Sequence, residues 1–545
     1  LVLPYGRSNK VLDLGQTWQL ATQVISHARV AWYNYDHRYN LAPISLVRSN
    51  HDQLMMKRNF FLLLLLLGGL ALVACGGGQD AAERQPTIPL TECRLTGGVV
   101  AQCATLTVPE NHDAAGGDTI DLAVAVLPAT GSSSVVQPDP VFLLAGGPGQ
   151  AATEVYPNIV YLFEEINRTR DLVLIDQRGT GEAAGFACEN LQDESLPADL
   201  PNEAVVGLFD ECRAALAEQV DLTQYTTDRF IEDLEAAREA LDYDTINLYG
   251  ASYGSRAALA YMRHHPDRIR SVVLDAVAGP ELVLFRDMPR DGQRALDLLF
   301  DRCAADAACN AAFPDLRAEY DDLLARLATP QPVTVAHPLT NEPLEFQMTR
   351  ERLSQYVFNI LYSVEFQSLL PLLLHHAHET GDFAPLVVQA LAVGQSAGVY
   401  PGLLYAVACS EDAPLIDPAA AEAIAQESSV GAMTVNFEAI CATWPRAEVA
   451  EDLRQPLQSD IPTLLLSGGS DPVTPPDYAA AVAATLPNSR HLVVPGFGHG
   501  VISVGCMPRV AAQFFRDGHA GDLDVTCLDE LQPPSFFVSF AGPEP

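Results

Sequence analysis

Short apolar segments, each running into or out of a loop of small and polar residues, constrain the fold of this chain more than any other feature. They alternate with stretches of helical pattern, such as residues 229–241. This alternation is typical of an α/β fold with a mainly parallel central sheet flanked by helices. The predicted strands are Ile120–Leu127, Val141–Leu144, Leu172–Ile175, Ile246–Tyr249, Val272–Leu274, Thr463–Leu466 and His491–Val494.

The alternation stops after Gly279 and returns close to residue 460. Residues 280–455 carry mostly helical patterns, which predict a helical cap inserted between later strands of the sheet. Such an insertion would lie over the strand ends, where open α/β sheets bind ligands. The expected segments are 91–279 and 456–530 for the two parts of the core, 280–455 for the cap and 531–545 for a tail.

Residues 55–75, MMKRNFFLLLLLLGGLALVAC, combine a basic start, an apolar stretch and a small-residue ending. This combination is typical of a secretory signal. The Leu-Val-Ala-Cys ending resembles a bacterial lipobox, in which Cys75 is lipidated and becomes the first mature residue. A membrane-spanning helix is disfavoured because the apolar stretch is shorter than the roughly 20 residues that cross a bilayer.

Such a signal must stand at the N-terminus of its protein, so we expect translation to start at Met55 or Met56. Residues 1–54 are then translated upstream sequence, disordered and outside the fold, and residues 76–90 form a tether. The expected product is an exported cell-envelope lipoprotein, on the periplasmic or outer-membrane face if the host is Gram-negative. The lipid anchor would be its only contact with a membrane.

Ten of the eleven cysteines follow Cys75, and an even number in an exported protein indicates disulfides. Zinc is disfavoured because no C-x-x-C pair occurs. The sequence leaves the connectivity open. Pairing of neighbours would give Cys93–Cys103, Cys188–Cys212, Cys303–Cys309, Cys409–Cys441 and Cys506–Cys527.

Two pentapeptides fit G-x-S-x-G, the pattern of a serine nucleophile on a sharp turn between a strand and a helix. Ser252 lies between the predicted strand 246–249 and a helical segment over 255–261. Ser396 follows a helical segment inside the predicted cap. The context therefore favours Ser252 as the nucleophile and predicts only a small-residue turn at Ser396.

A serine nucleophile needs a base that takes its proton and an acid that holds the base in the correct tautomer. Asp471 and His499 each follow a predicted strand, and they come after Ser252 in the order serine, acid, histidine. Asp460 and His491 precede or begin their strands and are weaker alternatives. The sequence thus predicts a triad, against the plainer interpretations of a helix-capping aspartate and an ordinary loop histidine.

The negative charge that develops during acyl transfer needs preorganised donors. One expected donor is the backbone N–H of Tyr253, the residue after the nucleophile. The other would come from the loop Gly146–Gly149, in which Pro148 has no N–H. Gly147 is the preferred donor and Gly149 the second choice; the alternative for this loop is a plain tight turn.

With these residues assembled, the chain resembles the tripeptidyl aminopeptidase-like branch of the serine peptidases, relatives of prolyl aminopeptidase. The resemblance covers about Cys93 to Cys527 and departs at Ala145, where many relatives have histidine. The motifs that carry it are Gly146–Gly149, Asp176–Gly181, Gly250–Gly254, Asp471 and Gly498-His499, with Cys103–Glu110 and the neighbourhoods of Cys409 and Cys441.

The resemblance implies an α/β-hydrolase fold, a helical cap that narrows the site, no cofactor, and release of short peptides or single residues from peptide N-termini. It also implies acidic residues that hold the α-ammonium group of the substrate. Glu154, Glu411 and Asp412 are candidates, although the last two could equally be loop charges. Asp176 and Arg178 are interpreted as structural, because an arginine–carboxylate pair can brace a loop.

Two other functions are consistent with the same sequence features. An esterase or other acyl hydrolase would share the triad, and a catalytically silent surface lipoprotein would only bind a partner. The formal net charge of −37 disfavours nucleic acid as a partner, because an acidic surface repels phosphate. His375, His376, His378 and Glu379 are interpreted as the polar face of a cap helix, so no metal is expected. The oligomeric state stays open.

Overall fold

The computed structural model describes residues 85–114, 116–191, 200–337, 340–394, 398–430 and 436–542. The predicted extension 1–54, the signal 55–75 with Cys75, most of the tether and Ser396 lie outside these residues. Among the helices that are described, none has the length and apolar character needed to cross a bilayer.

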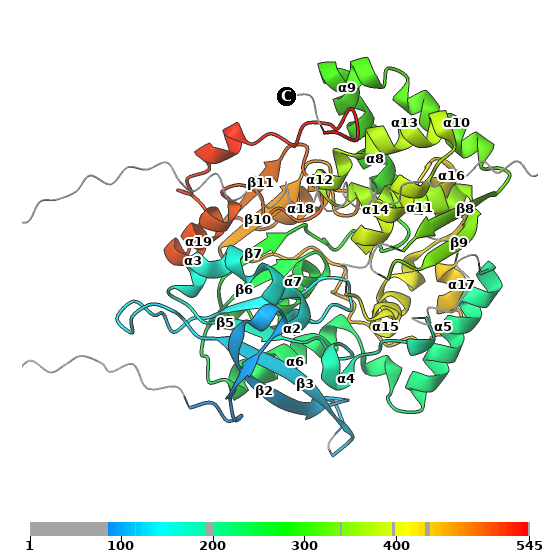
Figure 1. Cartoon of the computed structure of the whole chain (residues 1–545). Helices are drawn as coiled ribbons and strands as arrows, with labels where there is room; N and C mark the ends of the chain where they lie inside the picture. Colours follow the sequence, from blue (N-terminus) through cyan, green and yellow to red (C-terminus); the bar gives the residue numbers. More distant parts are fainter. Residues whose placement is uncertain are drawn as a thin grey trace, which may run out of the picture. The chain divides into compact units, whose positions relative to one another are not determined.

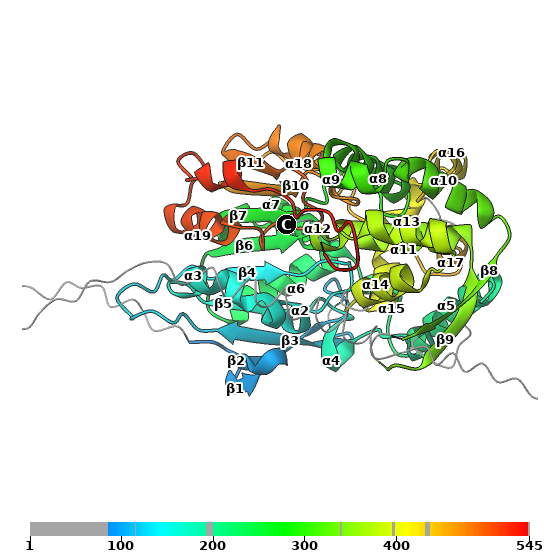
Figure 2. The same ribbon diagram turned by 45° about the horizontal axis from the view of Figure 1, so that its top comes forward.

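A nine-stranded sheet forms the centre of the structure, in the order β1-β2-β3-β5-β4-β6-β7-β10-β11 (Figures 1 and 2). The pairs from β1 to β5 are antiparallel, and those from β5 to β11 are parallel. The predicted, mainly parallel sheet is confirmed. Its strands are β1 (Thr91–Arg94), β2 (Val100–Pro109), β3 (Thr119–Leu127), β4 (Val141–Leu144), β5 (Leu172–Ile175), β6 (Ile246–Ala251), β7 (Ile269–Asp275), β10 (Thr463–Gly468) and β11 (Ser489–Val494).

Helices cover both faces of this sheet, which explains why β4 and β5 are apolar at every position. In β4, Phe142 packs in a core with α6 and α7, whereas its neighbour Leu143 packs in a second core with α19. The helices that flank the sheet are α2 (Ala152–Val155), α3 (Glu164–Asn167), α4 (Gly181–Ala184), α6 (Thr227–Ala240), α7 (Tyr253–His264), α18 (Pro476–Ala483) and α19 (Met507–Asp517). Helix α5 (Asn202–Ala217) packs instead against α15 (Pro401–Glu411) and α17 (Phe437–Cys441) of the segment between β7 and β10.

The segment between β7 and β10 is mainly helical and has a hydrophobic core of its own. The sequence analysis missed a two-stranded antiparallel sheet in this segment, formed by β8 (Gln331–Ala336) and β9 (Pro343–Met348). The helices of the segment are α8 (Met288–Ala305), α9 (Ala307–Ala312), α10 (Leu316–Arg326), α11 (Arg350–Leu361), α12 (Val364–Gln367), α13 (Leu370–Thr380), α14 (Ala384–Gly394), α15 (Pro401–Glu411), α16 (Pro418–Gln426) and α17 (Phe437–Cys441).

Five disulfides each join one cysteine to the next cysteine along the chain. The pair Cys409–Cys441 ties α15 to α17, and Cys506–Cys527 ties the start of α19 to the segment that follows this helix. The remaining pairs are Cys93–Cys103, Cys188–Cys212 and Cys303–Cys309. This is the set that neighbour pairing gives.

The loop after β5 is braced by a buried arginine. Arg178 is fully buried, and its guanidinium donates two 2.7 Å hydrogen bonds to the carboxylate of Asp233 on α6. Its remaining nitrogen donates to the carbonyl oxygens of Glu110 and Gln224. Asp176 is not the partner of Arg178; it accepts hydrogen bonds from Thr153. The brace therefore runs from the loop to α6.

We expect Asp233→Asn to lower the free energy of unfolding by about 3–5 kcal/mol, because it leaves the Arg178 charge buried without its counter-charge. Urea unfolding at unchanged m-value measures this change. Glu239→Gln is the control, because the Glu239 side chain is 67% exposed and its partner Arg238 keeps its ion pair with Glu235; it should change stability by less than about 0.5 kcal/mol. Equal stability of the two variants would contradict the brace.

Candidate active site

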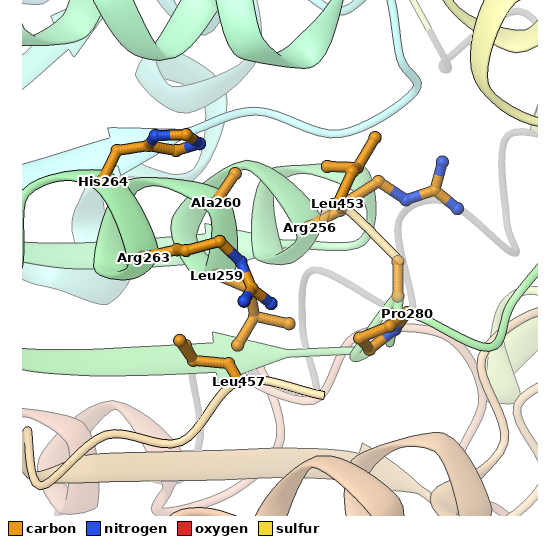
Figure 3. A pocket seen from close by; sticks show the side chains of 9 residues that line it. Arg256, Leu259, Ala260, Arg263, His264, Pro280, Leu453 and Leu457 are labelled. Carbon is orange, nitrogen blue, oxygen red and sulfur yellow. The ribbon is translucent and has the colours of Figure 1, made fainter. Parts of the chain in front are cut away.

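A cavity of about 720 Å³ lies where the carboxyl ends of the parallel strands meet helices α11 and α12. Ser252 and His499 line it from the core, and Tyr362 and Phe366 line it from the helical segment. Its volume is in the roughly 300–1,000 Å³ range of small-molecule sites. A second cavity, beside α7, measures about 20 Å³ (Figure 3). The second one has room for about one water molecule, so the large cavity is the candidate site.

Ser252 occupies a strained turn between β6 and α7. Its φ of 55° and ψ of −124° are rare for a residue with a side chain. The turn brings backbones so close that the flanking glycines cannot be replaced. A Cβ on Gly250 would lie 2.3 Å from the Gly254 oxygen, and one on Gly254 would lie 2.2 Å from the Leu144 oxygen. The local geometry is thus that of a strand–turn–helix elbow that presents a serine.

Asp471 and His499 are joined by a direct hydrogen bond. The Nδ1 atom of His499 lies 2.9 Å and 3.1 Å from the two carboxylate oxygens of Asp471. Asp471 is fully buried and also accepts hydrogen bonds from the backbone N–H of Val473, the backbone N–H of Thr474 and the Thr474 hydroxyl. The carboxylate therefore fixes the ring, with Nδ1 as the protonated nitrogen and Nε2 left as the basic one.

The pairing of Asp471 with His499 shifts the pKa values of both side chains in the direction that proton transfer requires. Burial alone would raise the pKa of Asp471, but attraction to His499 and the hydrogen bonds to the carboxylate lower it overall. Burial alone would lower the pKa of His499, but Asp471 raises it above its ordinary value. The arrangement favours an ionised Asp471 and a His499 that readily accepts a proton.

The helical segment contributes to the position of His499. The backbone N–H of His499 donates to the carbonyl oxygen of Tyr362 at the end of α11, over 2.8 Å. The two rings meet edge to face with centroids 5.3 Å apart. A Cβ on Gly498 would lie 2.4 Å from the same Tyr362 oxygen, so only glycine fits before the histidine.

The loop after β4 lies against the serine. A Cβ on Gly146 would be 3.2 Å from the Cβ of Ser252, and Gly146 and Gly147 line the cavity. Gly149 is not on the cavity wall, and its N–H donates to Gln177. Tyr253 begins α7, and the first N–H groups of a helix have no acceptor within it. Of the two glycine donors considered, the geometry favours Gly147.

The three acids predicted to bind an ammonium group have protein partners and are not on the cavity wall. Asp412 is fully buried and pairs with Arg256 and Arg454. Glu411 ends α15 and accepts two hydrogen bonds from Thr227, and burial raises its pKa to about 7. Glu154 is half-buried and accepts one from Tyr400. The structure thus places Glu411 at the end of a helix and Asp412 directly after it, both buried and paired with protein groups.

The sequence analysis did not single out Asp275, which lies on the cavity wall at the end of β7. Its fully buried carboxylate accepts hydrogen bonds from the backbone N–H groups of Val501 and Ile502, just after His499. The signal available in the sequence was an acid directly after the apolar run Val272–Leu274.

Gly254→Ala should reduce hydrolysis of a p-nitrophenyl ester at least about 100-fold, because the new Cβ pushes the serine turn away from β4. Initial rates, corrected for the folded fraction by circular dichroism, measure the effect. Gly207→Ala is the matched control, since a Cβ there meets nothing within 4 Å. If the two alanine variants retain equal activity, the close approach at Gly254 does not matter for the site.

Two family models match the chain. The model described as the alpha/beta hydrolase fold matches residues 139–380, and the model described as TAP-like protein matches residues 427–527. Together they include the segments that contain Ser252, Asp471 and His499.

Similar proteins are serine peptidases. Serine protease Hip1 of Mycobacterium tuberculosis is 27% identical over 483 residues, which cover 80% of this chain and 91% of Hip1. Tripeptidyl aminopeptidase of Streptomyces lividans is 27% identical over 198 residues, 33% of this chain and 36% of that protein. Proline iminopeptidase of Arabidopsis thaliana is 28% identical over 185 residues, 34% of each chain. The chain is thus an α/β-hydrolase that is similar to serine peptidases, and its residues 427–527 match the TAP-like model.

Proposed function

We propose that this enzyme releases single residues or short peptides from peptide N-termini through an acyl-enzyme. In this proposal Ser252 is the nucleophile, His499 the base and Asp471 the acid that orients the base. The observation that carries it is the hydrogen-bonded pair of Asp471 and His499, together with a serine on a strained turn in the wall of the same cavity.

The proposed reaction begins when Nε2 of His499 takes the proton of the Ser252 hydroxyl, whose oxygen attacks the scissile carbonyl carbon. The N–H groups of Tyr253 and Gly147 stabilise the oxyanion. His499 then gives the proton to the leaving amine, and the C–N bond breaks. Water, deprotonated by the same histidine, releases the acyl group and restores the serine.

N-terminal cleavage is supported by two relatives, whose names are tripeptidyl aminopeptidase and proline iminopeptidase. Of the acids considered for the substrate ammonium group, Glu154 is the one we retain. Glu154 is half-buried, and one of its carboxylate oxygens accepts a hydrogen bond from the Tyr400 hydroxyl. Val399, which precedes Tyr400 in the chain, lines the cavity. Glu411 and Asp412 are assigned a structural role, because buried protein groups occupy them.

An esterase or other acyl hydrolase with the same machinery is the alternative, because specificity depends on the site and not on the fold. A protein that only binds a partner is not supported by these relatives. Five disulfides and the likeness to Hip1 indicate export. We propose in addition that Cys75 carries a lipid that anchors the enzyme in the cell envelope.

We expect the enzyme to cleave a peptide with a free N-terminus at least about 10-fold faster, by kcat/KM, than the same peptide after N-acetylation, because acetylation removes the ammonium charge. Mass spectrometry of the products identifies the cleaved bond. Ser252→Ala should abolish cleavage and labelling by a fluorophosphonate. Indifference to acetylation would exclude the aminopeptidase, and preference for simple esters would favour the alternative.

A further inference from the structure

The wall of the large cavity is mainly apolar. Phe285, Met288, Phe358 and Phe366 line it on the side of the helical segment, and Ile159 and Leu162 line it on the side of the core. Burial of apolar surface against such side chains is favourable without any specific partner. A bulky apolar group of the substrate therefore gains affinity here from several directions.

The charged groups of this wall are already paired with protein groups. Apart from His499, the charged residues that line the cavity within the described part of the chain are Arg256 and Asp275. The guanidinium of Arg256 donates to Asp412 and to the carbonyl oxygen of Leu282. The Asp275 carboxylate accepts hydrogen bonds from the N–H groups of Val501 and Ile502 and from the Tyr249 hydroxyl. A charged side chain that entered the cavity would lose its hydration and meet only groups that already have protein partners.

We propose that the enzyme selects substrates whose acyl-side residue, the one next to the cleaved bond, is bulky and uncharged, such as Phe, Leu or Met. This inference rests on the proposed function, because it concerns the acyl group that Ser252 would carry. Complete burial of such a side chain corresponds to roughly a 10- to 100-fold gain in binding over an alanine. An acidic or basic residue forfeits this gain and also pays for desolvation.

The test uses peptides of one sequence that differ only at the acyl-side residue, with kcat/KM measured for Phe, Leu, Ala, Asp and Lys. Phe and Leu should exceed Asp and Lys by about 100-fold or more, with Ala between them. Equal rates, or a preference for a charged residue, would overturn the proposal. If no peptide is cleaved although an ester is, the proposed peptidase function fails instead.

Phe366→Lys supplies a direct test of the wall. Phe366 is half-buried on α12 and lines the cavity, so a lysine there places a cation beside the substrate. The variant should raise the kcat/KM ratio of the Asp peptide to the Phe peptide at least about 10-fold. Leu415→Lys is the control, because Leu415 is 45% exposed and lies outside the wall. An unchanged ratio in Phe366→Lys would count against the proposed position of the side chain.

A second, independent observation concerns Asp275, which contacts both the serine turn and the histidine loop. Its carbonyl oxygen accepts the backbone N–H of Ser252 over 2.9 Å. Its carboxylate accepts the N–H of Val501 over 2.9 Å and the N–H of Ile502 over 2.9 Å. The Tyr249 hydroxyl donates to the same carboxylate over 3.0 Å. Burial raises the pKa of Asp275 above its ordinary value, and these hydrogen bonds together with attraction to His499 offset part of that rise.

The position of Asp275 in the sheet explains why it contacts both the serine turn and the histidine loop. In the register of the parallel strands it stands opposite Ala251 at the end of β6 and opposite Leu466 in β10. The loops that follow these two strands carry Ser252 and Asp471. Asp275 is thus central among the strand ends that carry the proposed triad.

We infer that Asp275 is a positioning residue, which holds the His499 loop against the serine turn and places a carboxyl group near the imidazole. The inference rests on the proposed role of His499. Within the described part of the chain, the titratable residues that face His499 are Asp471, Asp275 and Tyr362, and the Thr474 hydroxyl lies 3.2 Å from its Nδ1 atom. Burial raises the pKa of Tyr362 above its ordinary value, so its hydroxyl stays neutral.

Asp275→Asn should slow fluorophosphonate labelling of Ser252 about 10- to 100-fold, because one carboxylate oxygen becomes an NH₂ group that faces the N–H donors of the loop. Removal of the charge also lowers the pKa of His499, since attraction to Asp275 is one of the effects that raise it. The acid limb of the labelling rate should therefore move to lower pH.

Asp139→Asn is the matched control. Asp139 is also buried and accepts hydrogen bonds from Arg170 and Asn247, but it does not line the cavity. This variant should lose stability and keep the wild-type pH profile. A profile in Asp275→Asn that matches that of Asp139→Asn would overturn the positioning role. Absence of labelling in the wild-type enzyme would instead reject the proposed role of Ser252.

Discussion

The site depends on how closely the chain passes from β6 through Ser252 into α7. Gly254 lies so near the carbonyl oxygen of Leu144 in β4 that a methyl group would overlap it. This contact sets the left-handed backbone at Ser252 and brings the loop after β4 beside the serine. The position of Ser252 on the cavity wall and that of the candidate oxyanion donor Gly147 are thus consequences of a single backbone approach.

The parallel arrangement of the strands brings the other groups to the same edge of the sheet. Asp471 follows β10 and His499 follows β11, and the two strands are paired in register from Thr463 to Gly468. Because parallel strands point the same way, the loops that leave them emerge side by side. Buried carboxylates then hold these loops: Asp471 binds the imidazole, and Asp275 binds the backbone that follows it.

The parts of the candidate site that follow from strand order could be predicted from the sequence. Ser252, Asp471 and His499 each come after an apolar strand, and that local pattern can be read without coordinates. The role of Asp275 could not be read, because its partner Val501 lies 226 positions away and contributes only a backbone N–H. The partner of Glu411 could not be predicted for the same reason, since Thr227, which donates a hydrogen bond to its carboxylate, is 184 positions distant.

The secondary structure that was missed has a similar explanation. β1 and β2 lie at the antiparallel edge of the sheet, where exposed residues interrupt the apolar pattern. β8 and β9 pair only with each other, and most of their residues are partly or fully exposed. Strands of this kind are fixed by their partner more than by their own sequence.

The helical segment and the core share the site unequally. The core supplies the serine turn, the acid and the histidine loop. The helical segment supplies the Tyr362 carbonyl oxygen, which accepts a hydrogen bond from the N–H of His499. Its larger contribution is the apolar wall, which includes Phe358 and Phe366. Side chains of this wall can change without moving a hydrogen bond of the proposed triad, since Tyr362 uses its backbone for that contact. In the proposed function, the same loops therefore serve different acyl groups, with the apolar wall of the helical segment selecting the substrate and the sheet positioning the reacting groups.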